Sequence, residues 1–251
     1  MEDDLKSVAE SLSGRTVDII PYLDYLLQDL WELGTDAAHV AAMFRTYLPL
    51  PFAERSVLDL GCGKGAVSIR IAKELGCKVD GFDLFPIFID HCQKLSKEHG
   101  VFGQCSFAVQ DIRQVVERGL RYDAVVYGAL GNVFGDTVSK LGKLKQTVAE
   151  KGLLYLDEAY QESGNDYPTY ESWIEAFQQQ NLTLIEAHEP SLDEISAVNW
   201  ENQRKIEYRA DQLIAKNPAI ASLIEDYVES QRLECIELET DIKPVCWLLR
   251  G

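Results

Sequence analysis

The sequence predicts an α/β fold in which helices cover both faces of a doubly wound, mostly parallel sheet. Strand-like and helix-like segments alternate through the middle of the chain, which is the pattern of consecutive βαβ units. The strand-like segments are apolar at nearly every position, as at Ala124, Val125 and Val126, so both of their faces should be buried between layers of helices. At 251 residues the chain can bury a sizeable core.

Two helices are expected before the first strand. Apolar residues recur at helical spacing over residues 17–31, and Gly34 is placed to end that helix. A second helix would begin after Thr35 or Asp36 as its N-cap. It would have to break at Pro49, because proline cannot continue a helix.

From residue 56 onward the pattern predicts strands separated by helices. The expected strands are 56–60, 78–83, 105–110, 122–127, 153–157, 182–187 and 245–249, and the expected helices are 65–75, 86–98, 112–118, 137–150 and 170–179. A long polar and largely helical stretch, 192–239, precedes the last strand. It has too few apolar residues for a core of its own, so we expect an insertion rather than a separate domain.

The composition is that of a globular protein with a strongly acidic surface. Hydrophobic residues make up 46% of the chain and charged residues 26%, and the formal net charge is −17. The electrostatic field of so acidic a protein repels phosphates unless a basic patch overcomes it. The nearest candidate patch has helical spacing and is expected to be a solvated face; it consists of Lys140, Lys143, Lys145 and Lys151. We therefore expect no nucleic-acid partner.

The cysteines and the N-terminus point to a reducing compartment. Six cysteines are scattered without a CxxC motif or metal-ligand spacing, so we expect reduced core thiols and no metal site. The first ten residues, MEDDLKSVAE, fit neither a secretory signal nor a transit peptide. No apolar run approaches the roughly 20 residues of a membrane span. The expected location is the cytoplasm, without a membrane partner.

The most informative segment is the turn after the first strand. The apolar strand ends in three alternating glycines, Gly61, Gly63 and Gly65, with Cys62 between the first two. A turn without β-carbons lets a ligand approach the backbone closely, and the following helix offers free N–H groups at its N-terminus. The segment therefore predicts a loop that binds a nucleotide-like cofactor.

Two acids narrow the class of cofactor. Asp83 ends the second strand, eighteen residues after Gly65, where a carboxylate can accept hydrogen bonds from the ribose of an adenosine. The glycines also fit the dinucleotide pattern GxGxxG/A, so a nicotinamide-dependent oxidoreductase is the main alternative. Asp59, two residues before Gly61, favours the cationic end of a methionine moiety over a pyrophosphate. The spacing of a P-loop is absent.

The strand and turn from Val57 to Gly65 resemble motif I of the class I S-adenosylmethionine-dependent methyltransferases. Asp111 and Ile112, after the third strand, are similar to the pair that holds adenine in that family, and residues 122–132 resemble its motif IV, which lies beside the transferred methyl. The resemblance implies S-adenosyl-L-methionine as cofactor. The implied cofactor-binding residues are Asp59, Gly61, Cys62, Gly63, Gly65, Asp83, Leu84, Asp111, Ile112, Tyr127 and Gly128.

The same resemblance implies a particular topology and domain organisation. It implies a seven-stranded sheet of order 3-2-1-4-5-7-6 with strand 7 antiparallel, and a cofactor at the carboxyl ends of strands 1 to 4. We expect one methyltransferase domain over 1–251. Its expected parts are a helical cap (1–50), a cofactor-binding core (51–190), a helical lid insertion (191–240) and the last strand (241–251).

Methyl transfer is an in-line displacement, so alignment can supply most of the acceleration and no universal catalytic residue is needed. A base matters only for an acceptor that is protonated at neutral pH. Asp157, Glu158 and His188 end the fifth and sixth strands and are the candidates. The other histidines, His39, His91 and His99, are expected to be surface or packing residues.

Aromatic side chains could attract the sulfonium or stack on the acceptor. Trp31 is assigned to the cofactor, and Tyr160, Trp200 and Tyr208, with Asn132, to the acceptor. The sequence thus predicts a methyltransferase for a small molecule with an N, O or C nucleophile, in a monomer or a homodimer. A protein methyltransferase, an NAD(P)-dependent oxidoreductase and a non-catalytic S-adenosylmethionine-binding scaffold remain alternatives.

Overall fold

The computed structural model describes Ala9, residues 12–163 and residues 166–251, so most of the N-terminal segment that bears on targeting lies outside the described residues. The described residues form two compact units. One contains Glu32–His188 and Val245–Gly251 and is called the sheet unit. The other contains the described residues up to Trp31 and Glu189–Pro244 and is called the helical unit.

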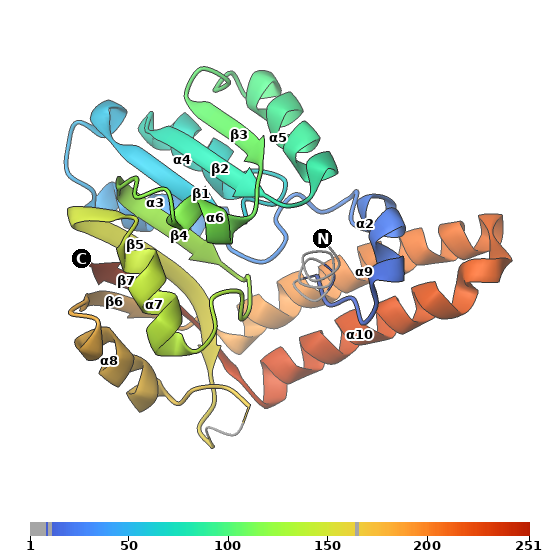
Figure 1. Ribbon diagram of the computed structural model, residues 1–251. Helices are drawn as coiled ribbons and strands as arrows, with labels where there is room; N and C mark the ends of the chain where they lie inside the picture. Colours follow the sequence, from blue (N-terminus) through green and yellow to red (C-terminus); the bar gives the residue numbers. More distant parts are fainter. Residues whose placement is uncertain (1–8, 10–11, 164–165) are drawn as a thin grey trace. The chain divides into compact units, whose positions relative to one another are not determined.

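The sheet unit contains a seven-stranded sheet of order β3-β2-β1-β4-β5-β7-β6, as predicted (Figure 1). Strand β1 pairs in parallel with β2 and with β4, and β6 pairs with β7 in antiparallel orientation. The strands are β1 (Ser56–Leu60), β2 (Lys78–Asp83), β3 (Cys105–Val109), β4 (Tyr122–Gly128), β5 (Val148–Tyr160), β6 (Thr183–His188) and β7 (Lys243–Arg250).

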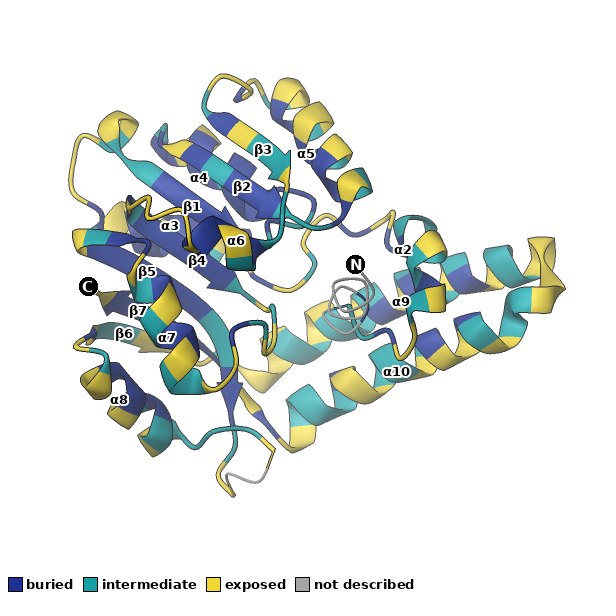
Figure 2. Ribbon diagram, in the orientation of Figure 1, coloured by how far each residue is buried: buried dark blue, intermediate teal, exposed yellow. Residues whose placement is uncertain are grey.

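Helices cover both faces of this sheet (Figure 1). They are α3 (Ala37–Tyr47), η2 (Phe52–Glu54), α4 (Ala66–Leu75), α5 (Pro86–Glu98), α6 (Ile112–Val116), α7 (Thr137–Lys145) and α8 (Tyr170–Gln179). Along β4, Ala124 and Val126 pack in the core beneath α3 and α4, whereas Val125 and Tyr127 pack beneath α6, α7 and α8. Figure 2 shows the central strands as almost entirely buried, as the apolar runs predict.

Local chemistry sets several helix boundaries. Asp36 is the N-cap of α3, as expected, and its Oδ1 accepts hydrogen bonds from the backbone N–H groups of Ala38 (2.7 Å) and His39 (3.1 Å). Helix α4 ends at Gly76, whose φ of +77° is the left-handed conformation that glycine adopts freely.

Three predicted helices are shorter in the structure, and one of them is α6, which ends at Val116 rather than at residue 118. Helix α7 ends at Lys145 and β5 already begins at Val148, so the prediction of helix to residue 150 is wrong. The hydroxyl of Thr147 donates to the carbonyl of Leu144 (2.7 Å), and the chain turns there into the strand. The helix predicted over 17–31 is η1 (Val17–Ile19) followed by α2 (Ile20–Leu26).

The helical unit is built around two long antiparallel helices, α9 (Leu192–Lys216) and α10 (Ala221–Thr240), joined through η3 (Pro218–Ile220). Helix α9 begins with a capping box between Ser191 and Glu194. Helix α2 packs on α9, and η1 packs on α10. The N-terminal helices thus supply apolar surface that the long helices lack. In the described part of the chain, no helix is long and apolar enough to cross a membrane.

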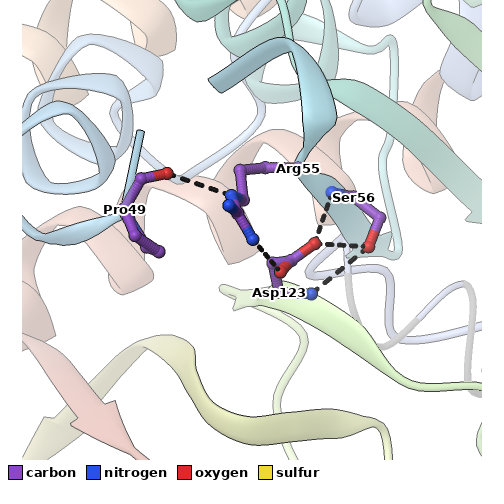
Figure 3. A network of polar contacts seen from close by, with 4 residues as sticks. All are labelled: Pro49, Arg55, Ser56 and Asp123. Carbon is purple, nitrogen blue, oxygen red and sulfur yellow. Dashed lines mark hydrogen bonds and ion pairs between the residues drawn. The ribbon is translucent and has the colours of Figure 1, made fainter. Parts of the chain in front are cut away.

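A polar clamp joins β1 and β4 where these strands begin (Figure 3). Asp123 accepts hydrogen bonds from the backbone N–H of Ser56 (2.8 Å) and from Arg55 (3.1 Å), and Arg55 also donates to the carbonyl of Pro49 (3.0 Å). Burial acts to raise the pKa of Asp123, but its Ser56 and Arg55 partners outweigh burial and lower it. The clamp fixes the register of the two central strands whose carboxyl ends carry the site.

Candidate active site

The glycine loop between β1 and α4 is held in a conformation that requires glycine. Gly61, Gly63 and Gly65 have φ values of +67°, +50° and +80°, a region that L side chains rarely adopt. A β-carbon on Gly65 would lie 2.9 Å from the Sγ of Cys92. The backbone N–H groups of Gly61 and Cys62 donate to one carbonyl of β2, at 2.8 and 3.0 Å. The loop is therefore a tight, backbone-lined turn at the carboxyl end of β1.

Asp83, at the end of β2, anchors this loop. Its Oδ2 accepts from the backbone N–H of Gly63 (2.9 Å) and its Oδ1 from that of Phe85 (2.8 Å). Burial raises its pKa, while these N–H groups act to lower it. Each carboxylate oxygen can accept a second hydrogen bond. The same side chain can therefore order the loop and still receive two hydroxyl groups.

Asp59 is buried within β1, with 3% of its surface exposed. The hydroxyl of Ser68 donates to its Oδ2 (2.5 Å). Burial raises the pKa of Asp59 to about 6, with a further increase from the charge of Asp83, and Ser68 acts to lower it. Within the described residues, no basic side chain forms an ion pair with this carboxylate, so its charge is available to a cation.

Buried thiols pack beneath the glycine loop. Cys62 and Cys92 belong to one apolar cluster with Ile89. The thiol of Cys92 donates to the carbonyl of Gly63 (3.2 Å), and burial raises the pKa of Cys62 well above its ordinary value. All six cysteines of the chain are free and buried, as predicted for core thiols.

The predicted adenine pair lies at the start of α6. Asp111 is the N-cap of this helix and accepts from the backbone N–H of Arg113 (2.8 Å). The guanidinium of Arg113 also donates to both of its carboxylate oxygens, at 2.8 and 3.0 Å. Ile112 is buried in the core beneath α6. The ion pair between Arg113 and Asp111 was not predicted from the sequence.

The segment after β4 turns sharply at the carboxyl edge of the sheet. Ala129 and Gly131 have positive φ values of +52° and +62°. The fully buried ring of Tyr127 lies under this turn, and its hydroxyl donates to the carbonyl of Gly131 (2.8 Å). Asn132 is exposed in the same loop. The Tyr127 side chain thus supports the loop from inside the core.

Glu158, a candidate base, forms a buried ion pair. The ammonium of Lys140 in α7 lies 2.5 Å from its Oε1, and the two side chains are 6% and 13% exposed. The ammonium also lies 5.5 Å from the ring centroid of Tyr127 and 5.6 Å from that of Trp173. The prediction that Lys140 lies on a solvated face is therefore wrong, because an acid and two aromatic rings cover it.

Asp157 precedes Glu158 in β5, so its side chain lies on the opposite face of the strand. Its backbone lies in register with Gly128, and its carbonyl accepts from Ala129 N–H (3.2 Å). Burial raises the pKa of Asp157 to about 6; the hydroxyl of Thr35 acts to lower it and the charge of Asp36 to raise it. Asp157 therefore titrates close to neutrality at the carboxyl edge of the sheet.

His188, the third candidate, stacks on His39 of α3, with ring centroids 4.3 Å apart and planes inclined by 26°. His188 is exposed and His39 half-buried. Burial, then the neighbouring His188, lowers the pKa of His39. His39 was expected to be a surface or packing residue; it packs, and its buried Nε2 has no hydrogen-bond partner among the described residues.

A family model described as "Methyltransferase domain" matches residues 52–210. This region is more than half of the chain and includes every strand from β1 to β6. The chain belongs to the methyltransferase-domain family. The family prediction made from the glycine loop and the acids after the first three strands is confirmed.

Two curated relatives of this methyltransferase-domain chain share segments with it. Ubiquinone biosynthesis O-methyltransferase of Methylobacterium nodulans is 40% identical over 78 residues, which cover 31% of this chain and 30% of the relative. Pavine N-methyltransferase of Thalictrum flavum subsp. glaucum is 28% identical over 108 residues, 41% of this chain and 29% of the relative. The chain thus matches less than a third of the length of either relative.

Solved structures share the fold over much more of the chain. A SAM-dependent methyltransferase from Thiobacillus denitrificans, in complex with S-adenosyl-L-homocysteine, has a TM-score of 0.73 at 16% identity, covering 91% of this chain and 97% of the other. Coclaurine N-methyltransferase bound to N-methylheliamine and SAH has a TM-score of 0.66 at 15% identity, covering 85% and 72%. At these identities the likeness supports the fold.

The predicted residues of this family member fall into both units. The sheet unit contains the glycine loop, Asp59, Asp83, Leu84, Asp111 and the ends of β4 and β5. Tyr160 also belongs there and packs edge to face on Tyr170, with ring centroids 5.4 Å apart. Trp31, Trp200 and Tyr208 belong to the helical unit, where the indole N–H of Trp200 donates to Glu239 (2.7 Å).

Three residues near the predicted site escaped the sequence analysis: Thr35, Tyr155 and Lys140. Thr35 was considered only as a helix cap, although a β-carbon on Gly128 would lie 2.1 Å from its Oγ1. Tyr155 lies in an apolar strand and gave no sequence signal for its unpartnered hydroxyl. Among the described residues no three His, Cys, Asp or Glu side chains gather into a metal-binding group.

Proposed function

We propose that this chain is an S-adenosyl-L-methionine-dependent methyltransferase acting on a small molecule. The observation that carries the proposal is the left-handed glycine loop after β1, which Asp83 holds through the backbone of Gly63. Membership of the methyltransferase-domain family supports it. The segments shared with an O- and an N-methyltransferase of small molecules favour a small acceptor.

The residues of the loop fit this cofactor better than a dinucleotide. Asp83 can receive the two ribose hydroxyls on its remaining lone pairs. Asp59 offers a buried negative charge to the amino end of the methionine moiety, whereas it would repel a pyrophosphate. The turns at Ala129 and Gly131 would bring the backbone of the β4 loop close to the methionine end.

The cofactor supplies a methyl group on a sulfonium, which is already activated toward a nucleophile. The protein's task is then to align the acceptor with that methyl and to exclude water, and alignment of this kind can contribute roughly 7–11 kcal/mol. Of the three candidate bases, Asp157 combines partial exposure with a pKa near neutrality. Glu158 is paired with Lys140 and is assigned a structural role.

We also propose a cytoplasmic location, because six free thiols fit a reducing compartment. The strongly acidic net charge of −17 disfavours a nucleic-acid acceptor.

Isothermal titration with S-adenosylmethionine, S-adenosylhomocysteine and NAD tests the proposal. Asp83→Asn should lose at least tenfold in affinity for both sulfur ligands. Asp80→Asn is the matched control, because this acid on the same strand accepts from Tyr122 (2.9 Å) rather than from the loop. Binding of NAD alone would identify a nicotinamide enzyme, and binding of none of the three would leave a scaffold.

A further inference from the structure

Two buried hydroxyl groups lie beside Asp157 at the carboxyl edge of β4 and β5. Thr35 is 9% exposed and Tyr155 is fully buried. The Thr35 hydroxyl acts on Asp157 and the Tyr155 hydroxyl on Cys246, but neither oxygen accepts a hydrogen bond from a described residue. A buried polar oxygen that accepts no hydrogen bond destabilises the folded state. Two such groups flanking one acid mark a place where atoms of a ligand can complete the hydrogen bonding.

The acid between them is Asp157. Its backbone is in register with Gly128, and the Thr35 hydroxyl lies directly against Gly128, where a β-carbon would be only 2.1 Å from Oγ1. The charge of Asp157 acts on the pKa of Tyr155 and on that of Cys246, whose pKa burial raises to about 12. The hydroxyl groups, the acid and the end of β4 therefore share one small region.

Asp36 and Asp157 form no ion pair with a basic side chain among the described residues. Asp36, at the start of α3, raises the pKa of Asp157 and also that of Glu32, for which burial is the larger cause. The groups that interact with Asp157 are Thr35, Cys246 and Tyr155, the acidic Asp36, and Glu158, whose charge is paired with Lys140. Such a region favours a positively charged ligand that carries N–H donors.

We propose that the methyl acceptor is a protonated primary or secondary amine, bound through its N–H groups by Asp157 and Thr35 beside the end of β4. This inference rests on the proposed function and specifies its substrate class. The ammonium would donate a hydrogen bond to Thr35 Oγ1 and would neutralise the acid.

Asp157 also removes the proton that blocks the reaction. One N–H proton of the ammonium passes to the carboxylate of Asp157, which frees the nitrogen lone pair. That lone pair forms a bond to the methyl carbon while the carbon–sulfur bond breaks and its electron pair returns to sulfur. The product is a methylated ammonium and a neutral thioether, and protonated Asp157 releases its proton to solvent.

The test compares amines with neutral molecules of the same shape. Benzylamine, phenethylamine and tetrahydroisoquinoline are titrated into the protein saturated with S-adenosylhomocysteine, beside benzyl alcohol, phenethyl alcohol and isochroman. We expect the amines to bind at least tenfold more tightly than their neutral counterparts. Equal affinity for amines and neutral molecules, or no amine binding, would overturn the proposal.

Two variants test whether Asp157 and Thr35 are the residues that bind the amine. Asp157→Asn should weaken amine binding at least tenfold and Thr35→Val severalfold, with unchanged affinity for S-adenosylhomocysteine. Asp90→Asn, an exposed acid of α5, should change neither. If Asp157→Asn instead weakens S-adenosylhomocysteine binding, the region serves the cofactor and the amine proposal is wrong. Failure of the wild-type protein to bind S-adenosylhomocysteine would refute the proposed function itself.

Methyl transfer from labelled S-adenosylmethionine to the bound amines supplies the second readout. Because burial raises the pKa of Asp157 to about 6, kcat/KM should fall as the pH drops through that value. This acidic limb should be absent from the residual activity of Asp157→Asn. A limb that persists in the variant would assign the proton transfer to another group.

Discussion

The buried charge of Asp59 should lower the stability of the fold and strengthen cofactor binding, and one substitution tests both effects. Its carboxylate is almost fully buried and accepts a hydrogen bond only from Ser68 among the described side chains. Asp59→Asn keeps the shape and an oxygen that can accept from Ser68, but removes the charge. We expect this variant to be more stable than the wild-type protein at neutral pH and to bind S-adenosylmethionine at least tenfold more weakly.

The size of the stability change follows from the pKa of this acid. Burial raises the pKa of Asp59 from 3.8 to about 6. One pKa unit corresponds to about 1.4 kcal/mol, so the ionised form costs about 3 kcal/mol at pH 7. Because the folded-state pKa is raised, the stability contributed by the protonated form is fully present below about pH 4. It is lost as the pH rises through about 6.

Urea denaturation of both proteins between pH 4 and pH 8 measures this difference. The gain in unfolding free energy for Asp59→Asn should grow from pH 4 to pH 7 and then level off. Ser68→Ala is the matched control with the opposite sign, because removal of the hydroxyl that lowers the Asp59 pKa should destabilise the protein at pH 8. A pH-independent difference, or an asparagine variant less stable at pH 8, would refute the reasoning.

Three further substitutions test the surroundings of the site. Lys140→Met should lower the unfolding free energy by about 3–5 kcal/mol, because it leaves Glu158 buried without its partner. The double variant Lys140→Met, Glu158→Met should regain most of this unfolding free energy, as measured by urea denaturation. Gly65→Ala, at φ +80°, should cost at least about 1 kcal/mol and weaken S-adenosylmethionine binding in titration, whereas Gly103→Ala, at a site open to solvent, should do neither. An acid whose pKa is lowered in the folded state stabilises the protein only while it is ionised, so the wild-type protein should lose stability below about pH 4. Asp123→Asn should remove this loss. An equal decrease in unfolding free energy below about pH 4 in both proteins would contradict the prediction.

The parts of the site that the sequence revealed depend on short-range rules. Three alternating glycines after an apolar strand predict a left-handed turn, and all three have positive φ. Thr35 or Asp36 was predicted to cap a helix, and Asp36 does so through two backbone N–H groups. In both cases the residues that interact are within a few positions of each other, so the spacing along the chain carries the geometry.

Lys140 and the pair of His39 and His188 show where such rules stop. Helical spacing indicated that Lys140 shares a face with other lysines, but it did not indicate that Glu158 and two aromatic rings cover Lys140. His39 and His188 are stacked, although 149 positions separate their numbers in the sequence. Nothing in the local sequence of α3 indicates that β6 ends against it.

The sequence by itself determined the family, the order of the elements and the loop that would hold the cofactor. Apolar periodicity, glycine φ preferences and capping act over a few residues, and each leaves a pattern that can be read along the chain. Only the tertiary structure decided which polar groups are left without partners at the carboxyl edge of the sheet. Asp157 meets Gly128 there because parallel strands end at one edge of the sheet, and the segment before α3 places Thr35 against both. Burial at that edge sets the hydrogen bonding and the charge of these groups.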